Sequence, residues 1–162
     1  MSSDDINDHD HEQESNQCTF CAISSERDFT SLLYVDENVV AFNDIKPAAT
    51  HHVLVVPKKH IPNVNSLKND DLETVKKMKE VGLQIISRRL HESVDDLQKN
   101  YQDKKERTYQ IGFVSPPFNS INHIHMHVLS KPIKTWWPRS LGFGRFIFKD
   151  IDDVINKIEN SQ

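Results

Sequence analysis

One short segment in the last third of the chain alternates histidine with apolar residues, and it constrains the fold more than any other feature. It reads His-Ile-His-Met-His-Val-Leu and runs from His123 to Leu129. Side chains of an extended strand point alternately to its two faces. The three imidazoles therefore share one face, while the apolar side chains share the other and can pack on a core. Because neighbouring imidazoles are costly unless they are solvated, ligated or paired, we predict a strand with a functional face.

A second histidine cluster begins at His51, and its strand is predicted to end at Pro57, which lacks the N–H that a sheet requires. On this strand His52 shares a face with Leu54, whereas His51 faces the other way. If the two histidine strands are neighbours, His52 reaches the same pocket. Imidazole titrates near neutral pH, so the pocket would supply a nucleophile, a proton donor and a cation for phosphate oxygens. Phosphoryl or nucleotidyl transfer fits those groups.

The remaining patterns predict an α+β domain with an antiparallel sheet of about five strands, one long helix and one or more short helices. A capping box formed by Asp70 and Glu73 is expected to start the long helix. Three residues, 36–38, form the turn of a β-hairpin. The expected strands are residues 31–35, 39–42, 51–56, 109–114 and 122–129, and the expected helices are residues 70–91 and a short one from Asp150, with an exposed connection at 95–107.

The chain has 162 residues, which is enough for one ordinary domain. Residues 1–17 hold six acidic residues and no Lys or Arg, and we predict a disordered acidic tail there and a folded domain over 18–162. The net charge of the whole chain is -4, so the remainder carries +2. This near-neutral body disfavours nucleic acid as the partner and favours a small molecule. With no apolar run of membrane length and no basic leader, we expect a cytoplasmic and also nuclear protein with no membrane partner.

The motifs resemble those of one known family. The segment from His123 to Leu129 matches all seven positions of the motif of the histidine-triad superfamily. Residues 42–47 and 50–60, together with Ser120, look like the Hint branch of nucleotide-binding phosphoramidases. Pro116-Pro117-Phe118 resembles the third Hint class and also the catalytic domain of the aprataxin family. The resemblance covers residues 18–160 and implies the fold of that superfamily.

The resemblance implies a role for each candidate catalytic residue. His125 would attack the phosphorus of an adenosine 5′-phosphoramidate and form a nucleotidyl-histidine, which water then cleaves to release AMP. His127 would bind phosphate oxygens, and His123 would orient the site. His52 would lie near the leaving group as a proton donor, and Ser120 would contact the departing amine. The substrate class includes acyl- and aminoacyl-adenylates, and a homodimer is expected.

Nucleotide binding is expected at a larger set of residues, among which Asp44 would accept hydrogen bonds from the ribose hydroxyls. The set is Phe20, Ile23, Phe42, Asn43, Asp44, Ile45, Leu54, Asn119, Ser120, His125 and His127. The loop before the triad lacks the usual Gly-rich stretch of the branch and has residues 112–115 where an Asn contact to the nucleotide would be expected. Trp137 belongs to a Trp-Pro segment similar to one at the Hint C-terminus, and its part in defining the leaving-group side stays open.

No cofactor is expected to be required for catalysis, but a structural zinc site is one interpretation of the cysteine pair. Cys18 and Cys21, with His60 and His123, have the donor set for tetrahedral zinc, as in zinc-bearing members of the superfamily. The alternative is two thiols packed at the start of a short helix.

Three other functions compete with phosphoramidate hydrolysis. The first is the aprataxin-like removal of adenylate from nucleic-acid ends, which is weakened because no basic arm follows the triad. The second is a metal-dependent centre with the three histidines as ligands, and the four glycines of the chain argue against the Gly-rich barrel that such sites use. The third is a nucleotide-binding scaffold with little turnover.

Overall fold

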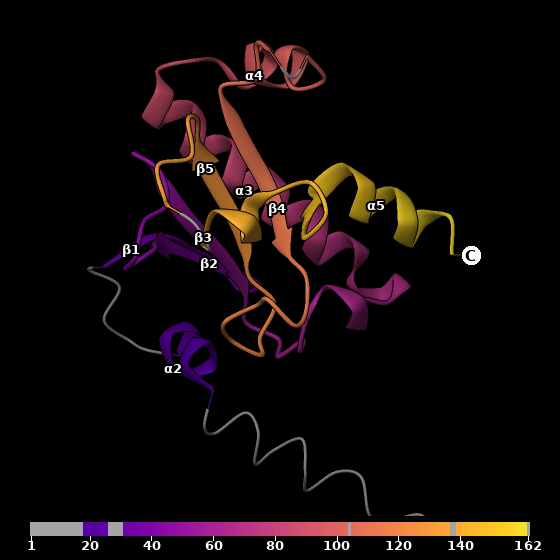
Figure 1. Cartoon of the computed structure of the whole chain (residues 1–162). Helices are drawn as coiled ribbons and strands as arrows, with labels where there is room; N and C mark the ends of the chain where they lie inside the picture. The colour runs from indigo at the N-terminus through magenta and orange to yellow at the C-terminus, as the bar shows by residue number, and fades with distance from the viewer. Residues whose placement is uncertain (1–17, 26–30, 104, 137–138, 162) are drawn as a thin grey trace, which may run out of the picture.

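The fold is built on a six-stranded antiparallel sheet whose strands adjoin in the order β1-β2-β3-β5-β4-β6 (Figure 1). The computed structural model describes residues 18–25, 31–103, 105–136 and 139–161. The strands are β1 (Leu32–Val35), β2 (Val39–Asn43), β3 (His52–Pro57), β4 (Tyr109–Val114), β5 (Met126–Ser130) and β6 (Phe148–Asp150). The α+β class and the antiparallel sheet are confirmed, and β6 is a sixth strand that the sequence pattern did not predict. The predicted acidic tail and Trp137 lie outside the described residues.

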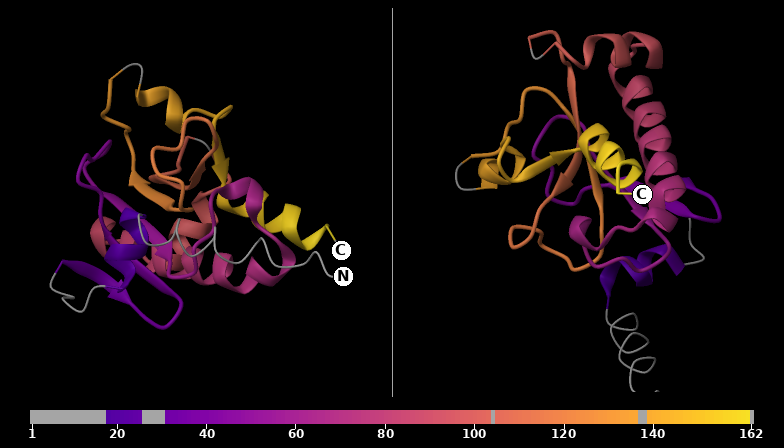
Figure 2. Two further views of the ribbon diagram at one scale, coloured as in Figure 1. Left: turned by 90° about the horizontal axis from the view of Figure 1, so that it is seen from below. Right: turned by 90° about the vertical axis from the view of Figure 1, so that its right-hand side faces the viewer.

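In the described part of the chain, four α-helices and three short 3-10 helices accompany the sheet. The helices are α2 (Thr19–Ser25), α3 (Leu72–Leu90), α4 (Val94–Asn100) and α5 (Ile151–Glu159), and the 3-10 helices are η1 (Val64–Ser66), η2 (Asn69–Asp71) and η3 (Arg139–Phe143). Figure 2 shows α3 along one side of the sheet and η3 on the opposite side. None of the helices in the described part of the chain combines the length and the apolar character needed to cross a membrane.

The two faces of the sheet have separate apolar clusters. Val53 and Val55 of β3 point to the face covered by α3 and join the main core. Leu54 and Val56 point to the other face, where they pack with Phe20 of α2. This alternation follows from the two-residue period of a strand. It leaves α3 with the structural core and reserves the second face, under α2 and η3, for the histidines.

The predicted hairpin is confirmed, and Asp36 explains its turn. The Asp36 carboxylate accepts hydrogen bonds from the backbone N–H groups of Asn38 and Val39, each at 2.8 Å. Such Asx contacts hold a tight turn without help from neighbouring elements. β1 and β2 then pair directly on either side of residues 36–38.

The predicted capping box of the long helix, formed by Asp70 and Glu73, is not the one found; Asp71 takes part instead. Asp70 is exposed, whereas the buried Asp71 accepts a hydrogen bond from the Lys68 backbone N–H at 3.0 Å and one from Lys59 Nζ at 2.7 Å. Asp71 thus caps the Lys68 backbone N–H at the start of η2, and α3 begins at Leu72. Sequence spacing indicated a capping box here but did not distinguish the two adjacent aspartates.

The strand that carries the histidines is shorter than predicted. β5 begins at Met126, and its pairing with β3 ends at the Val55–Met126 pair. Pro57 has no N–H with which to extend the ladder. The chain before Met126 instead follows the loop after β3, where the Ile124 N–H donates to the Ile61 carbonyl at 2.6 Å. Only His127 of the three histidines therefore belongs to the regular strand.

Gly82 sets the distance between α3 and the histidine strand. A Cβ atom at this position would lie 2.8 Å from Met126 Cε and 2.9 Å from Val128 Cγ2. Both side chains belong to the core face of β5, opposite His127. The absence of a side chain at Gly82 thus lets the helix support this strand at close range.

We expect Gly82→Ala to lower the stability of the protein. Alanine would gain about 1 kcal/mol of helix propensity over glycine, but overpacking a dense core costs about 1–3 kcal/mol. The clash with β5 should outweigh the propensity gain, and a net loss of 1 kcal/mol corresponds to a Tm about 2–4 °C lower for a protein of this size. Thermal unfolding by circular dichroism measures the effect. Arg88→Ala, on the exposed side of α3, is the control, and a Gly82→Ala variant at least as stable as wild type would contradict the argument.

Candidate active site

Antiparallel pairing of β3 with β5 brings the two histidine clusters together. Leu54 pairs with His127 and His52 pairs with Leu129. His52 and His127 are therefore diagonal neighbours on one face, and His52 Nε2 lies 2.9 Å from His127 Nδ1. Both side chains are buried. The strands are neighbours, as the sequence-based expectation required, and His52 contacts His127, although His52 is not itself among the residues that line the cavity.

Hydrogen bonding fixes which nitrogen of each histidine in this pair carries the proton. The Ala48 backbone N–H donates to His52 Nδ1 at 3.0 Å, so Nδ1 of His52 must hold a lone pair. The proton of neutral His52 is then on Nε2, which donates to His127 Nδ1. His127 in turn must carry its proton on Nε2. Among the buried polar side-chain atoms of the described residues, His127 Nε2 has no hydrogen-bond partner in the protein.

His125 has the opposite tautomer. Its Nδ1 lies 2.7 Å from the backbone carbonyl of His123, which can only accept, so the proton is on Nδ1. The Nε2 atom then has a free lone pair. Phe20 packs edge-on against the ring with the centroids 5.1 Å apart, and the His127 ring lies 4.9 Å away on another side. The site therefore sets a hydrogen-bond acceptor on His125 beside a hydrogen-bond donor on His127.

Burial keeps these imidazoles neutral. It is the main cause of a lowered pKa for His125 and His127, and it lowers the pKa of His52 to about 4. Asp44 partly offsets the effect at His52, because its Oδ2 atom lies 3.4 Å from His52 Nε2. Neutral rings are required for the tautomers deduced above, and only a neutral His125 can act as a nucleophile.

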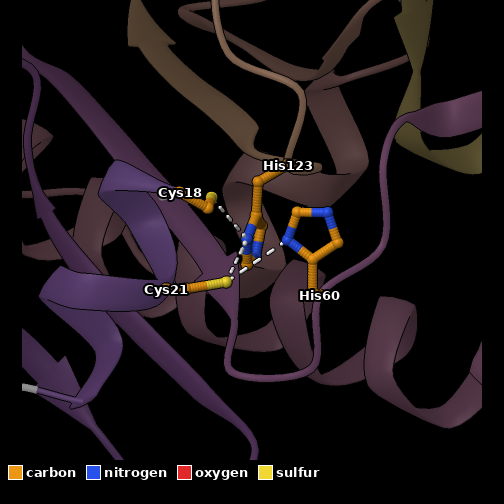
Figure 3. A group of neighbouring side chains, drawn as sticks. All are labelled: Cys18, Cys21, His60 and His123. Carbon is orange, nitrogen blue, oxygen red and sulfur yellow. Dashed lines mark hydrogen bonds between the residues drawn. The ribbon is translucent and has the colours of Figure 1, made fainter. Parts of the chain in front are cut away.

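His123 points away from its two companions. Figure 3 shows its ring between the pair of cysteines, Cys18 and Cys21, on one side and His60 on the other. His123 Nδ1 lies 3.4 Å from each sulfur, and His60 Nδ1 lies 3.2 Å from Cys21 Sγ. The predicted orienting role of His123 thus takes a different form, because its backbone carbonyl holds His125 while its imidazole belongs to this cysteine–histidine cluster.

The cluster has the donors and tautomers of a metal site. The four donor atoms of Cys18, Cys21, His60 and His123 all lie within 4.8 Å of one another. His123 Nε2 donates to the Pro57 carbonyl at 2.8 Å, which leaves Nδ1 as a lone pair directed at the sulfurs. Burial lowers the pKa of His123 to about 4, and burial together with Cys18 raises the pKa of Cys21 to about 11. Two cysteine side chains are thus held beside the imidazoles of His60 and His123.

A cavity of about 1010 Å³ opens over the histidines. Ten of the eleven residues expected to bind the nucleotide line it, namely Phe20, Ile23, Phe42, Asn43, Asp44, Ile45, Leu54, Ser120, His125 and His127. Asn119 does not line this cavity, and its side-chain amide donates to the Ile121 carbonyl at 3.3 Å instead. Apolar residues of α2, β2 and β3 form one wall next to His125.

The opposite wall was not foreseen from the sequence. Phe143 of η3 packs edge-on against His127 and His52, with ring centroids 5.4 and 5.7 Å apart. Arg139 lines the same part of the cavity and donates a hydrogen bond to the Lys46 backbone carbonyl. These residues lie in an irregular segment without periodic pattern, and the one available signal was the cluster of aromatic and basic residues after the triad.

Comparisons with known proteins agree with this fold and site. The family model described as "Scavenger mRNA decapping enzyme C-term binding" matches residues 17–140. The crystal structure of a HIT family hydrolase from Legionella pneumophila has a TM-score of 0.53 and 26% identity, and the match covers 75% of this chain and 98% of that one. With its His-apolar-His-apolar-His segment, the chain belongs to the histidine-triad family.

Within that family the chain belongs to the Hint branch. It is 38% identical over 148 residues to the bifunctional adenosine 5′-phosphosulfate phosphorylase/adenylylsulfatase HINT4 of Arabidopsis thaliana, covering 87% of this chain and 90% of the relative. It is 38% identical over 114 residues to the adenosine 5′-monophosphoramidase HINT3 of Xenopus tropicalis, covering 70% and 67%. Aprataxin of Danio rerio is more distant, with 26% identity over 85% of this chain and 39% of the relative.

The deduced tautomers can be tested directly. In long-range ¹H–¹⁵N spectra of the wild-type protein near neutral pH, His52 and His127 should show the pattern of imidazoles protonated on Nε2, and His125 that of an imidazole protonated on Nδ1. His52→Ala assigns the His52 signals by their loss and removes the N–H donor to His127 Nδ1. A His127 ring protonated on Nδ1 in the wild-type protein would contradict the hydrogen-bond direction deduced here.

Proposed function

We propose that the protein is a nucleotide-binding hydrolase that cleaves the P–N bond of adenosine 5′-monophosphoramidates through a covalent nucleotidyl-histidine. The observation that carries this proposal is the pair of complementary imidazole nitrogens at the cavity, a free lone pair on His125 Nε2 and a free donor on His127 Nε2. The relatedness to HINT3 proteins, which are adenosine 5′-monophosphoramidases, supports it.

The first step of the proposed reaction uses His125 as the nucleophile. Its Nε2 lone pair forms a bond to phosphorus while the P–N bond breaks and the electron pair leaves with the amine. The positive charge that develops on the His125 ring is stabilised because Nδ1–H already donates to the His123 carbonyl. His127 Nε2–H donates to a phosphoryl oxygen, where charge accumulates in the transition state.

The departing amine needs a proton, and the His52–His127 pair is the source that we propose. A bound phosphate raises the pKa of nearby imidazoles, so substrate entry favours uptake of one proton by this pair. The proton passes to the amine nitrogen as the P–N bond breaks. In the second step, water attacks phosphorus and gives up a proton to the His52–His127 pair, while the bond to His125 breaks and its electron pair returns to Nε2, so that AMP is released with the nucleophile restored.

The walls of the cavity suggest how the nucleotide lies. The apolar wall with Phe20, Phe42 and Leu54 offers aromatic and aliphatic surface to a base. Asp44 is 13% exposed at its side chain, with Oδ1 held by the Lys46 N–H at 2.8 Å. A carboxylate that only accepts hydrogen bonds suits the paired hydroxyls of a ribose. Ser120 remains the proposed contact to the amine.

We expect His125→Ala to abolish turnover but keep nucleotide binding. Loss of a covalent nucleophile costs at least about a thousandfold in kcat, whereas the base-binding wall is unaffected. Release of amine from adenosine 5′-monophosphoramidate measures the first effect, and calorimetric titration with AMP measures the second. His51→Ala is the matched control, because this histidine lies beside His52 but does not line the cavity.

Trapping the intermediate separates the enzyme from a scaffold. Rapid acid or base quench with radiolabelled substrate should yield one nucleotidyl group on the wild-type protein and none on His125→Ala. AMP binding without any adduct or turnover in the wild-type protein would favour the scaffold instead.

A second candidate reaction is cleavage of adenosine 5′-phosphosulfate. The HINT4 relative bears this activity in its name and aligns with most of this chain. The same attack by His125 Nε2 would break the P–O bond to sulfate, and sulfate leaves without a proton. The aprataxin-like reaction on nucleic-acid ends has weaker support, because the aprataxin relative is only 26% identical to this chain and is covered over 39% of its length.

We also propose that Cys18, Cys21, His60 and His123 bind a structural zinc ion. Zinc with these ligands separates sulfur from nitrogen by about 3.5 Å in a tetrahedron, close to the 3.2–3.4 Å found here. The Pro57 carbonyl that holds His123 Nε2–H is a typical outer partner of a metal-binding histidine. A bound ion would hold α2, which carries Phe20, to the loop before His125.

If this proposal is right, protein purified from zinc-replete medium contains about one zinc per chain, and Cys21→Ser lowers this content. Cobalt in place of zinc should give the intense visible absorption of a tetrahedral site with thiolate ligands. Metal content by mass spectrometry and the cobalt spectrum provide the measurements, with His51→Ala as the control. A wild-type protein without metal and without the cobalt spectrum would leave two packed thiols as the correct interpretation.

A further inference from the structure

The wall of the cavity formed by η3 and the loop after β2 is positively charged. Of the described residues that line the cavity, Lys46 and Arg139 are the ones with a permanent positive charge. Arg139 belongs to η3, whose Phe143 packs on His52 and His127, and its guanidinium donates to the Lys46 carbonyl, whereas Phe20 packs on His125. The charge of the cavity is therefore divided, with an apolar wall next to His125 and cations next to His127.

Arg139 is anchored rather than free at this wall. Its guanidinium donates to the Lys46 backbone carbonyl, which ties η3 to the loop after β2. Phe143, one turn further along η3, packs on both His127 and His52. A guanidinium has five N–H donors in a planar fork, so one bond to a carbonyl leaves others for a ligand.

The charge of Arg139 also acts on the histidine pair. After burial, it contributes to the lowered pKa of both His52 and His127. A cation that destabilises two neighbouring imidazolium ions lies close enough to stabilise an anion in the same place. Asp44 is the one carboxylate among the described residues that line the cavity, and its contacts are with the Lys46 N–H and His52 rather than with Arg139.

We propose that Arg139 forms an anion site for the leaving group, so that the preferred substrates are adenylates whose departing group carries its own negative charge. This inference rests on the proposed P–N hydrolase function and names the substrate class of that site. With the base on the Phe20 wall and phosphorus at His125, the departing group extends towards η3. A carboxylate on that group meets the Arg139 fork in the geometry that suits paired N–H···O bonds.

The test compares two substrates that differ only in charge. AMP is joined through a P–N bond to glycine in one and to glycinamide in the other, so the bond that breaks is the same. Wild-type protein should cleave the glycine compound with a kcat/KM about 10- to 100-fold higher, the range that a charge-assisted hydrogen bond provides. Arg139→Gln should abolish this preference mainly by slowing the glycine compound, and Arg139→Lys should keep part of it.

Arg145→Gln is the matched control. Arg145 follows in the same segment, but its guanidinium lies over the Phe146 ring at 5.1 Å and does not line the cavity. This variant should keep the preference of the wild-type protein.

Several outcomes would overturn the anion site. Wild-type protein that cleaves both compounds without preference contradicts it while leaving the proposed function intact. An Arg139→Gln variant that slows both compounds equally shows that Arg139 acts on the shared phosphate or on folding, and also overturns it. Wild-type protein that cleaves neither compound shows that the proposed function itself is wrong.

Discussion

The antiparallel pairing of β3 with β5 is the interaction on which the rest of the site depends. Its register places His52 diagonally across from His127, at hydrogen-bond distance. A slip of one residue would turn one of these imidazoles to the core face under α3, because side chains alternate along a strand. The apolar side chains on that face, Val53 and Val128, are fully buried, so the hydrophobic core fixes the same register that the chemistry needs.

Once the register is fixed, hydrogen bonding determines how the buried imidazoles of His52 and His127 are protonated. A neutral imidazole has one donor and one acceptor, and a buried one needs a partner for each. The Ala48 N–H satisfies the acceptor of His52, whose donor satisfies the acceptor of His127. One donor, the Nε2–H of His127, is left over at the end of this series of hydrogen bonds, and it lies at the cavity. The unsatisfied group is thus the consequence of a backbone amide four residues before the start of β3, and a ligand with anionic oxygens completes the network.

The sequence predicted the parts of this arrangement that depend on local pattern. Strand alternation and the stop at Pro57 indicated both histidine strands, and the Asp36 turn gave the first hairpin. The sequence did not reveal that β5 starts only at Met126, because this depends on where the partner strand β3 reaches Pro57, which has no N–H group. For the same reason the ring of His123 could not be placed, since its direction follows from the loop that contains Pro57 and Ile61. The contribution of η3 was missed entirely, because an irregular segment has no period from which its position could be inferred.

The two sides of the triad segment receive different kinds of support. His123 is held by sulfur and carbonyl groups, and its backbone carbonyl in turn fixes the tautomer of His125. His127 is held by another imidazole and covered by Phe143. A change in the cysteine–histidine cluster therefore reaches His125 through the His123 carbonyl and through Phe20 of α2, whereas a change at η3 reaches His127 through ring packing. The contacts of His125 and those of His127 thus come from different segments, α2 and the loop before β5 on one side and η3 on the other.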